Sequence, residues 1–423
     1  MKQIRSDPEA VRSALSRRGA ADELDELLGV DERRRELNTR IDAIRAEQNK
    51  LSGEIEEAAK AGKAGDPEFA GLRDQSSALK SELKELEPQL GELDERRDAL
   101  LLSLPNLPDP EAPDGETEED NVTLREVGER PEFGFEPLDH LELGQRHGWI
   151  EMEAAAELSG SRFAYLMGDL VMLELILVRF AMERISAEGF LPTVPPVLVR
   201  ERALFGTGVF PDEREMIYEV PKDELFLVGT SVVSLASLHA DQIMEAADLP
   251  KRYGGFSTCF RREAGAAGRD TRGIFRVHQF DKVEMFSFVE PSTSGEEQER
   301  LLAIQESILG ELEIPYRVVD IAVGDLGAPA ARKFDCEAWI PSQERYREVT
   351  SCSNTTDYQA RRLSSRYRAA QGEPPEPVHT LNGTAVAVGR TLIALLENGQ
   401  REDGTVGIPA SLQEFGAPER IPT

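Results

Sequence analysis

Apolar side chains recur at alternating steps of three and four residues over residues 33–102, and this pattern predicts two long helices. The first apolar seam comprises Leu37, Ile41, Ile44, Leu51 and Ile55, and the second comprises Leu72, Leu79, Leu83, Leu86, Leu90, Leu93 and Leu100. This spacing is typical of a coiled coil. We therefore expect an antiparallel hairpin of two helices, each about 25–30 residues and roughly 40 Å long. Residues 61–67 form its tip, and Pro88 should kink the second helix.

Residues 103–121 are predicted to form a linker, because four prolines stiffen this acidic segment. Beyond it, short runs of β-branched and aromatic residues predict strands at 225–228, 256–260, 283–289, 317–323 and 334–340, and helices are predicted at 139–188 and 298–312. Strands and helices do not alternate strictly, which favours an α+β fold with an antiparallel or mixed sheet flanked by helices. The expected domains are a helical domain at 1–102, the linker at 103–121 and a mixed domain at 122–423.

Charge and composition narrow the classes of function. The 423 residues include 49 Lys and Arg against 79 Asp and Glu, a formal net charge of −30, which argues against general binding of nucleic acid or anionic membranes. The most apolar stretch, 165–182, carries Asp169, Glu174 and Arg179, so we expect a buried helix rather than a membrane span. The three cysteines form no CxxC pair and the N-terminus has no apolar core, which together favour a reducing, cytoplasmic location.

The predicted hairpin is close to balanced in charge. Between Asp31 and Asp98 the sequence has 13 basic and 18 acidic residues. Two helices with one seam each bury little surface, so their polar flanks are free for another role. A solvated spacer, a dimerisation arm and a contact arm for a long partner all fit this composition.

The densest candidate chemistry lies at residues 260–280. Arg261, Arg262 and Glu263 follow a strand-like run, and a loop containing Gly265, Gly268, Arg269, Asp270, Arg272 and Gly273 comes next. Arginine guanidinium groups form paired hydrogen bonds to phosphate oxygens, and glycines allow a loop to fold over a ligand. This segment therefore suits a polyphosphate ligand. A solvated hairpin with surface salt bridges fits the same residue types.

Three further segments carry candidate chemistry. Lys282 and Glu284 share one face of a predicted strand, where Glu284 can accept from an ammonium or a hydroxyl. Glu348 and Ser351 offer oxygen ligands of the kind that magnesium prefers, although a loop with a helix cap explains them as well. Arg390 stands at the start of a predicted helix, where it can bind a nucleotide. A surface arginine without such a role fits the same position.

Taken together, these segments resemble the seryl-tRNA synthetases of bacterial type, which are class II aminoacyl-tRNA synthetases. The resemblance covers the hairpin, the linker and three motifs, at 189–196, 260–280 and 384–390. The strings 265–280 and 350–354 occur in register, which makes the resemblance specific. It implies that 1–102 is a tRNA-binding arm and that 122–423 is a catalytic domain with a class II antiparallel sheet.

The resemblance also implies a two-step reaction. L-serine and ATP give seryl-adenylate and pyrophosphate, and the seryl group then passes to tRNA(Ser), and to tRNA(Sec) where one exists. Mg²⁺ is the implied cofactor. A cytoplasmic homodimer is the implied assembly, without membrane or DNA partners. Such a reaction needs no covalent nucleophile, and catalysis rests on alignment and charge stabilisation at phosphorus.

The same resemblance assigns residues to roles. Arg261 would hold the α-phosphate and the serine carboxylate, and Arg390 would grip the γ-phosphate; both are the expected catalytic residues. The implied ATP-binding residues are Arg261, Arg262, Glu263, Arg276, Val277, His278, Gln279, Glu348, Val349, Thr350, Ser351 and Arg390, and Glu348 and Ser351 would also hold the metal. The implied serine-binding residues are Thr230, Ser231, Val232, Glu284 and Thr384. Candidate phosphate contacts to tRNA are Arg40, Lys50, Lys60, Lys63 and Arg73.

The sequence departs from the family at one position. The family has a Thr-x-Glu motif whose glutamate contacts the serine ammonium, and the matching segment here is Thr230-Ser231-Val232. A hydrogen bond to a charged group contributes about 1.5–3 kcal/mol, so we expect serine activation to be weaker by about 10- to 150-fold than with glutamate there. The departure leaves open a synthetase-like paralogue that binds tRNA or ATP with lost or altered amino-acid activation. A purely structural coiled-coil protein would leave the motifs after residue 190 unexplained.

Overall fold

A computed structural model describes residues 1–62, 66–264, 270 and 272–422. The chain divides into two compact units, Met1–Leu107 and Pro108–Thr423. The first unit consists of helices, and the second is built around a large sheet. Residues 109–121 of the predicted linker are bonded to the second unit: the Asp109 N–H donates to the Ala331 carbonyl at 2.8 Å, and the Val323 N–H donates to the Pro113 carbonyl at 2.9 Å.

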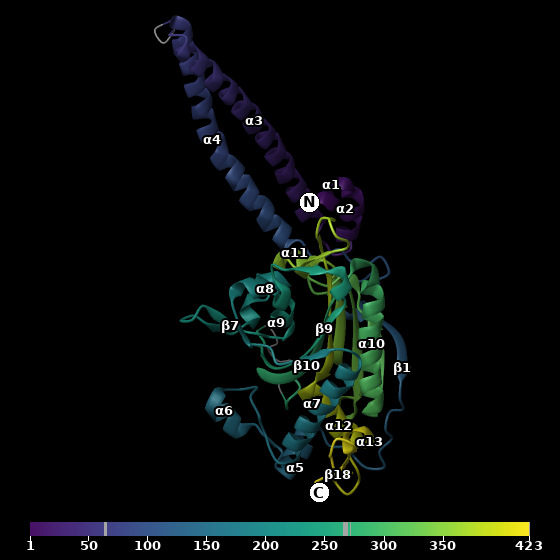
Figure 1. Cartoon of the computed structure of the whole chain (residues 1–423). Coiled ribbons are helices and arrows are strands. Elements are labelled where there is room, and N and C mark those ends of the chain that lie inside the picture. The colour runs from purple at the N-terminus through teal and green to yellow at the C-terminus, as the bar shows by residue number, and fades with distance from the viewer. Residues whose placement is uncertain (63–65, 265–269, 271, 423) are drawn as a thin grey trace. The chain divides into compact units, whose positions relative to one another are not determined.

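The helices of the first unit are α1 (Lys2–Ser6), α2 (Pro8–Ser16), α3 (Ala21–Lys60) and α4 (Pro67–Ser103), and α3 and α4 lie side by side (Figure 1). The predicted seam is confirmed where Ile41 and Ile44 of α3 pack against Leu83 and Leu86 of α4. The helices, of 40 and 37 residues, are longer than expected. Helix α3 begins before the predicted seam, and its first turns pack on α2 and on the end of α4. Helix α4 continues through Pro88.

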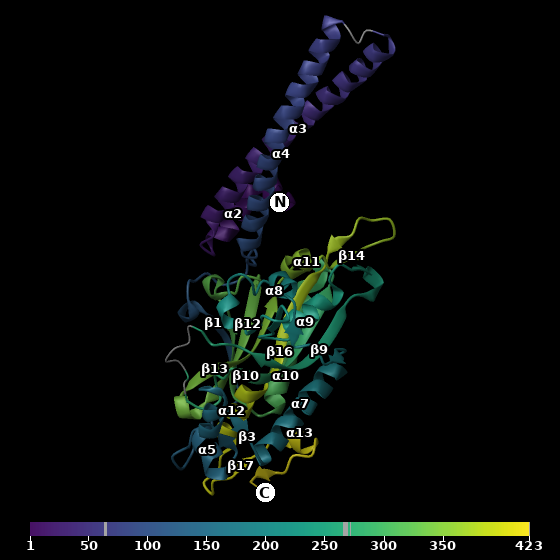
Figure 2. The same ribbon diagram turned by 90° about the vertical axis from the view of Figure 1, so that its left-hand side faces the viewer.

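The second unit contains an eight-stranded sheet in the order β1-β11-β12-β13-β16-β10-β9-β4 (Figure 2). Its strands are β1 (Val122–Val127), β4 (Leu191–Thr193), β9 (Lys251–Phe260), β10 (Gln279–Val289), β11 (Tyr316–Asp320), β12 (Arg332–Ile340), β13 (Arg345–Asn354) and β16 (His379–Ala387). Neighbouring strands pair antiparallel, except that β4 and β9 are parallel. The predicted antiparallel-dominated sheet flanked by helices is therefore confirmed.

Shorter elements surround this sheet. Small sheets are formed by β5 (Leu198–Val199), β6 (Glu219–Val220) and β7 (Leu225–Leu227), by β8 (Ile243–Glu245), β14 (Arg366–Arg368) and β15 (Glu376–Pro377), by β2 (Ile150–Glu151) and β3 (Tyr165–Leu166), and by β17 (Val406–Gly407) and β18 (Arg420–Ile421). The helices are α5 (His140–His147), α6 (Glu153–Ser159), α7 (Asp169–Ala187), α8 (Glu201–Thr207), α9 (Val232–Ala236), α10 (Ser294–Glu311), α11 (Tyr358–Leu363), α12 (Val388–Gly399) and α13 (Ala410–Gln413).

The prediction of one long helix over 139–188 is wrong. The segment contains α5, β2, α6, β3 and α7 in succession. Gly148 and Gly160 end α5 and α6 with φ angles of +68° and +96°, and Gly168 precedes α7 with a φ angle of +58°. Glycine enters this backbone region at little cost. The chain therefore reverses direction where the apolar pattern alone suggested continuity.

The two faces of the sheet have different roles. Val283 and Met285 of β10 belong to the main core, which they share with apolar residues of α7, α10 and α12. Figure 1 shows α10 along one face of the sheet, and α8 and α9 on the other side. Because side chains alternate along a strand, Lys282 and Glu284 of β10 lie on the face opposite this core. That opposite face holds the candidate site. No helix in the described part of the chain is long and apolar enough to cross a membrane.

Candidate active site

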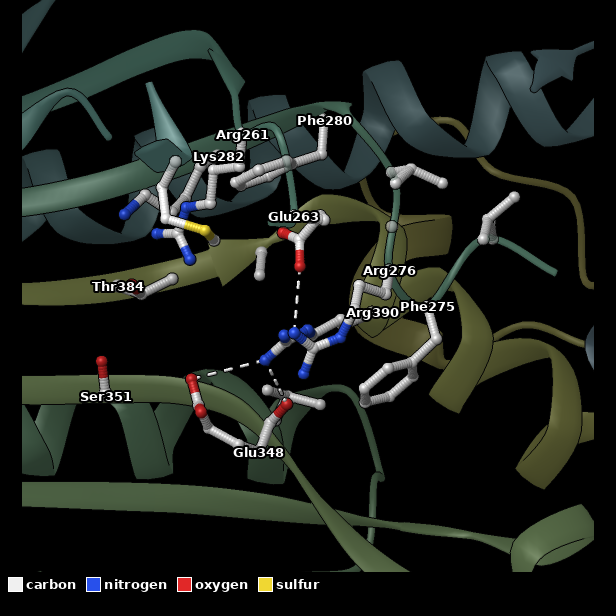
Figure 3. Close-up of a pocket in the computed structure, with 16 residues that line it drawn as sticks. Arg261, Glu263, Phe275, Arg276, Phe280, Lys282, Glu348, Ser351, Thr384 and Arg390 are labelled. Carbon is white, nitrogen blue, oxygen red and sulfur yellow. Dashed lines mark hydrogen bonds and ion pairs between the residues drawn. The ribbon is translucent and has the colours of Figure 1, made fainter. Parts of the chain in front are cut away.

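A polar pocket opens on the face of the sheet opposite α10 (Figure 3). Arg261 and Glu263 enter it from the end of β9, Lys282 from β10, Ser351 from β13, and Arg390 from the start of α12. The remaining lining residues are Met216, Ile274, Phe275, Arg276, Val277, Phe280, Glu348, Val349, Thr384, Ala387 and Gly389. The structure therefore brings together segments that are as much as 174 residues apart in sequence, from 216 to 390.

Arg261 lines one edge of the pocket. One of its hydrogen-bond donors is bonded to the backbone, which leaves the others for a ligand. Its Nε donates to the Gly229 carbonyl at 3.1 Å, and its guanidinium lies 5.4 Å from the centre of the Phe280 ring. Among the described residues, no carboxylate forms an ion pair with it. A guanidinium has five N–H donors, so fixing Nε orients the other four without using them. Such an arginine suits a bidentate anionic ligand.

The segment after Arg261 turns sharply and is tied to the start of β10. Glu263 has a φ angle of +50°, a conformation that is uncommon for residues other than glycine. Its carboxylate accepts from Arg276 Nη1 at 2.9 Å. Asp270 accepts from both Nη atoms of Arg347, at 2.9 and 2.6 Å, and this pairing holds the pKa of Asp270 below its ordinary value. The predicted residues Gly265, Gly268 and Arg269 lie outside the described part of the chain.

The Phe275 ring lies close to two guanidinium groups at the outer part of the pocket. The guanidinium of Arg390 is 4.9 Å from the centre of the Phe275 ring, and that of Arg347 is 4.0 Å from it. Arg390 Nη1 also donates to the Glu348 carbonyl at 2.9 Å and lies 3.4 Å from Glu348 Oε1. A flat apolar face beside cationic groups suits a planar base that carries phosphates.

A bulge in β13 brings Glu348 and Ser351 into the same pocket. In a regular strand, residues three apart point to opposite faces. Here Cys336 of β12 pairs with Thr350 and Glu337 pairs with Glu348, so the strand carries one extra residue at this point. Burial alone would raise the pKa of Glu348, but the charges of Arg390, Lys333 and Arg261 outweigh it and hold that pKa below the ordinary value. Glu348 is therefore a carboxylate at neutral pH.

The inner end of the pocket contains a buried polar network. Lys282 Nζ donates to Thr230 Oγ1 at 2.6 Å and pairs with Glu284 Oε2 at 2.6 Å. Glu284 also accepts from Thr384 Oγ1 at 3.1 Å and from Asn382 Nδ2 at 3.3 Å. Three of the predicted serine-binding residues, Thr230, Glu284 and Thr384, are thus connected through Lys282.

Several predicted residues lie outside the pocket lining. Arg262 turns toward the Tyr218 ring, 5.7 Å from its centre, and His278 Nδ1 bonds to the Arg261 carbonyl at 2.8 Å. Gln279 lines a neighbouring cavity, and Thr350 is buried on the other side of β13. Ser231 and Val232 are buried at the start of α9. Alternation along extended segments explains these positions, since a run of consecutive residues cannot all face one side.

Seven lining residues are absent from the predicted site: Met216, Ile274, Phe275, Phe280, Lys282, Ala387 and Gly389. Lys282 was recognisable, because it alternates with Glu284 on one strand face. Phe275 and Phe280 stand inside the string that carries the resemblance, but apolar residues there look like core. Met216 reaches the pocket from a short 3-10 helix, Arg214–Met216, and nothing in its local sequence indicates this.

The predicted tRNA contacts are surface residues of α3 and α4. Arg40 and Lys60 are exposed and pair with Glu82 and Glu56, Lys50 lies near Glu54, and Arg73 is exposed. Lys63 lies outside the described residues. Pairs of this kind are weak in water, so the basic side chains remain available to an anionic partner.

The described residues contain no group of three or more His, Cys, Asp or Glu side chains arranged to hold a metal ion. Glu348 and Ser351 nevertheless place two oxygen atoms in a pocket lined by Arg261 and Arg390. Mg²⁺ commonly binds through one or two protein oxygens together with phosphate oxygens. This donor set therefore fits a magnesium ion that arrives with a polyphosphate.

Comparisons with known proteins agree along the whole chain. The family model for the class II tRNA synthetase core domain (G, H, P, S and T) matches residues 217–399, and that for the seryl-tRNA synthetase N-terminal domain matches residues 1–108. A serine–tRNA ligase of Acidothermus cellulolyticus is 50% identical over 416 residues, which cover 98% of this chain and 97% of the relative. A serine–tRNA ligase of Streptomyces avermitilis is 49% identical over 419 residues, covering 98% and 96%. The crystal structure of seryl-tRNA synthetase from Pyrococcus horikoshii complexed with ATP superposes with a TM-score of 0.94 at 41% identity, covering 99% of this chain and 98% of that one.

Proposed function

Because this chain belongs to the seryl-tRNA synthetase family, we infer that it is a serine–tRNA ligase, which activates L-serine with ATP and transfers the seryl group to tRNA(Ser). The observation that carries this conclusion is identity of 50% and 49% to serine–tRNA ligases over 98% of the chain. The alternative of a paralogue without serine activation has no support from these relatives. ATP is the nucleotide substrate, in agreement with the ATP complex of the structural relative.

The pocket supports a mechanism based on positioning. Arg261 would bind the α-phosphate together with the serine carboxylate, because its fixed Nε leaves a fork of donors for two anions. A serine carboxylate oxygen then attacks the α-phosphorus and pyrophosphate leaves. Arg261 and Arg390 stabilise the charge that develops on the phosphate oxygens, and no side chain needs to act as a base.

The outer part of the pocket would bind the nucleoside and the γ-phosphate. The Phe275 ring offers a stacking face for adenine, and Arg390 beside it would reach the terminal phosphate. Glu263, fixed by Arg276, has acceptor capacity for the adenine amino group. Of the residues predicted from the sequence, Arg262, His278, Gln279 and Thr350 would act by shaping this segment.

Mg²⁺ is the proposed cofactor. Glu348, whose pKa is held low, and Ser351 would bind it through oxygen atoms. When bound, the ion would neutralise phosphate charge and withdraw electrons from the phosphorus under attack. The protein positions these two ligands through the bulge in β13, which directs the side chains of Glu348 and Ser351 into one pocket.

We assign the serine side chain to the inner end of the pocket. Glu284 and Thr384 are the groups there that can bond the serine hydroxyl, and Thr230 lies beside them. A pocket built to bond a hydroxyl can reject an analogue without it by about 10⁴- to 10⁵-fold, because its buried polar groups would be left unpaired. Alanine is therefore the natural competitor that this arrangement excludes.

The helical hairpin is the proposed tRNA arm. Its near-balanced charge suits recognition of RNA shape and backbone better than base readout, with Arg40, Lys50, Lys60, Lys63 and Arg73 as candidate phosphate contacts. A tRNA(Sec), where one exists, would bind in the same way. The partners are thus L-serine, ATP and tRNA, without DNA or a membrane.

A cytoplasmic homodimer is the proposed assembly. Several large apolar side chains of α7 and of the β4 segment are exposed in the single chain: Met172 at 58%, Leu175 at 58%, Leu191 at 59% and Val194 at 80%. Neighbouring exposed apolar residues of this kind are typical of a protein interface. A second copy of the chain would cover them.

Serine-dependent exchange between ATP and labelled pyrophosphate, followed by serylation of tRNA(Ser), tests the proposed function. We expect exchange with serine and no detectable exchange with alanine, and transfer to tRNA(Ser) but not to an unrelated tRNA. Omitting Mg²⁺ should abolish both steps. Absence of exchange with serine in a folded protein would refute the assignment.

A further inference from the structure

The inner end of the pocket already holds a cation that belongs to the protein. Lys282 Nζ lies 2.6 Å from Glu284 Oε2 and 2.6 Å from Thr230 Oγ1. The side chains of Lys282 and Glu284 are 9% and 0% exposed. A buried carboxylate that bonds a buried ammonium is already neutralised, so it attracts a second ammonium only weakly.

The other acceptors near Lys282 are also occupied. Thr230 Oγ1 accepts from Lys282 and from the Val232 N–H at 3.3 Å, which uses both of its lone pairs and leaves it only a proton to donate. Glu284 accepts from Thr384 as well as from Lys282. Val232 itself offers only hydrocarbon, and its side chain packs in the cluster that contains Phe286. Glu284, the carboxylate of this network, is thus already paired.

We propose that Lys282, by pairing with Glu284, leaves the α-ammonium of an amino acid without a free carboxylate, so that this ligase discriminates only weakly between L-serine and its 2-hydroxy analogue, L-glycerate. The inference rests on the proposed function, because it places serine at the Lys282 end of the pocket. The α-ammonium of serine adds a positive charge beside Lys282 and Arg261, which opposes binding. The 2-hydroxyl of glycerate is neutral, and it can accept from Lys282 and from the Thr230 hydroxyl.

Activation of L-glycerate follows the same reaction as activation of serine. A carboxylate oxygen of the acid forms a bond to the α-phosphorus of ATP. The bond from that phosphorus to the oxygen bridging to the β-phosphate breaks, and pyrophosphate leaves with the electron pair. Nothing is oxidised or reduced. Both acids carry the same 3-hydroxyl group, so comparing them isolates the contribution of the ammonium.

The decisive measurement is kcat/KM for pyrophosphate exchange with L-serine and with L-glycerate, using the full chain. We expect the two values to differ by less than about tenfold, since a charged hydrogen bond to the ammonium is missing. A preference for serine above 100-fold would overturn the inference while leaving the proposed function intact. No exchange with either acid would instead refute the proposed function.

Variants test the two residues behind the inference. Val232→Glu should raise the serine-to-glycerate ratio by about 10- to 150-fold by providing an ammonium acceptor. Val232→Leu, which adds bulk but no acceptor for the ammonium, is the matched control and should leave the ratio within about threefold of the original. Lys282→Met should also raise the ratio, because it frees Glu284 for the substrate ammonium. Thermal unfolding checks that each variant is folded, and an unchanged ratio in folded Val232→Glu and Lys282→Met would refute the inference. If neither variant folds, the ratio of the original chain decides.

Discussion

Replacing Arg261 by lysine tests the proposed role of a fixed guanidinium fork. The substitution keeps one positive charge but loses the anchor from Nε to the Gly229 carbonyl and the planar pair of Nη donors. A lysine ammonium can reach one oxygen at a time and has no fixed direction. The variant therefore separates charge from geometry at the position where the reacting phosphate is expected.

The size of the effect follows from the bonds that lysine cannot replace. Four N–H donors remain on Arg261 after Nε is bonded, enough for two bonds each to the α-phosphate and the serine carboxylate. Lysine would retain about one of the two contacts. Losing one charged hydrogen bond costs about 1.5–3 kcal/mol, which corresponds to about a 10- to 150-fold fall in kcat/KM. Arg261→Ala, which loses both contacts, should fall by about 10²- to 10⁴-fold.

The assay is serine-dependent pyrophosphate exchange with ATP and serine each varied. Arg262→Lys is the matched control, because Arg262 turns toward Tyr218 and does not line the pocket. We expect this control to stay within about threefold of the original chain, as is usual for changes away from a site. The reasoning would be refuted if Arg261→Lys kept full activity, or if both lysine variants lost activity equally.

Three further predictions address stability, the metal and the tRNA arm. Burial and the nearby charge of Asp281 raise the pKa of Glu174 to about 7, so stability from its protonated form is present below about pH 4.5 and is lost as pH rises through 7. Glu174→Gln should therefore gain about 1–3 kcal/mol relative to the original chain at pH 8 but not at pH 5, measured by urea unfolding. Glu348→Gln should raise the Mg²⁺ concentration needed for half-maximal exchange by about 10- to 100-fold, because losing a ligand costs at least as much as losing a group that supports one. Reversing the charge of Arg40, Lys50 and Lys60 to glutamate should lower kcat/KM for serylation of tRNA by roughly tenfold and leave pyrophosphate exchange unchanged; equal loss in both assays would contradict a role in tRNA binding.

The strands and the hairpin could be predicted because their patterns are local. The seam around Ile41 and Leu83 follows directly from heptad spacing, and the strands that carry Val283 and Phe334 are short runs rich in β-branched and aromatic residues. The failed helix over 139–188 had the same kind of apolar pattern. Its breaks depend on left-handed glycines such as Gly148, and a glycine in sequence does not reveal its φ angle.

The site could be predicted less well than the fold, because the pairing register of the strands decides which side chains face the pocket. Glu348 and Ser351 are three residues apart and would face opposite sides of a regular strand, and only the bulge in β13 places both in the pocket. A bulge depends on pairing with the next strand, which local sequence does not specify. Lys282 and Glu284, by contrast, are two residues apart on β10. They therefore point to the same face of the sheet whatever the register of that strand. Their shared face also explains why the departure at Val232 has a structural consequence: the cation that shares this face with Glu284 pairs with that carboxylate, and the substrate ammonium has to compete with it.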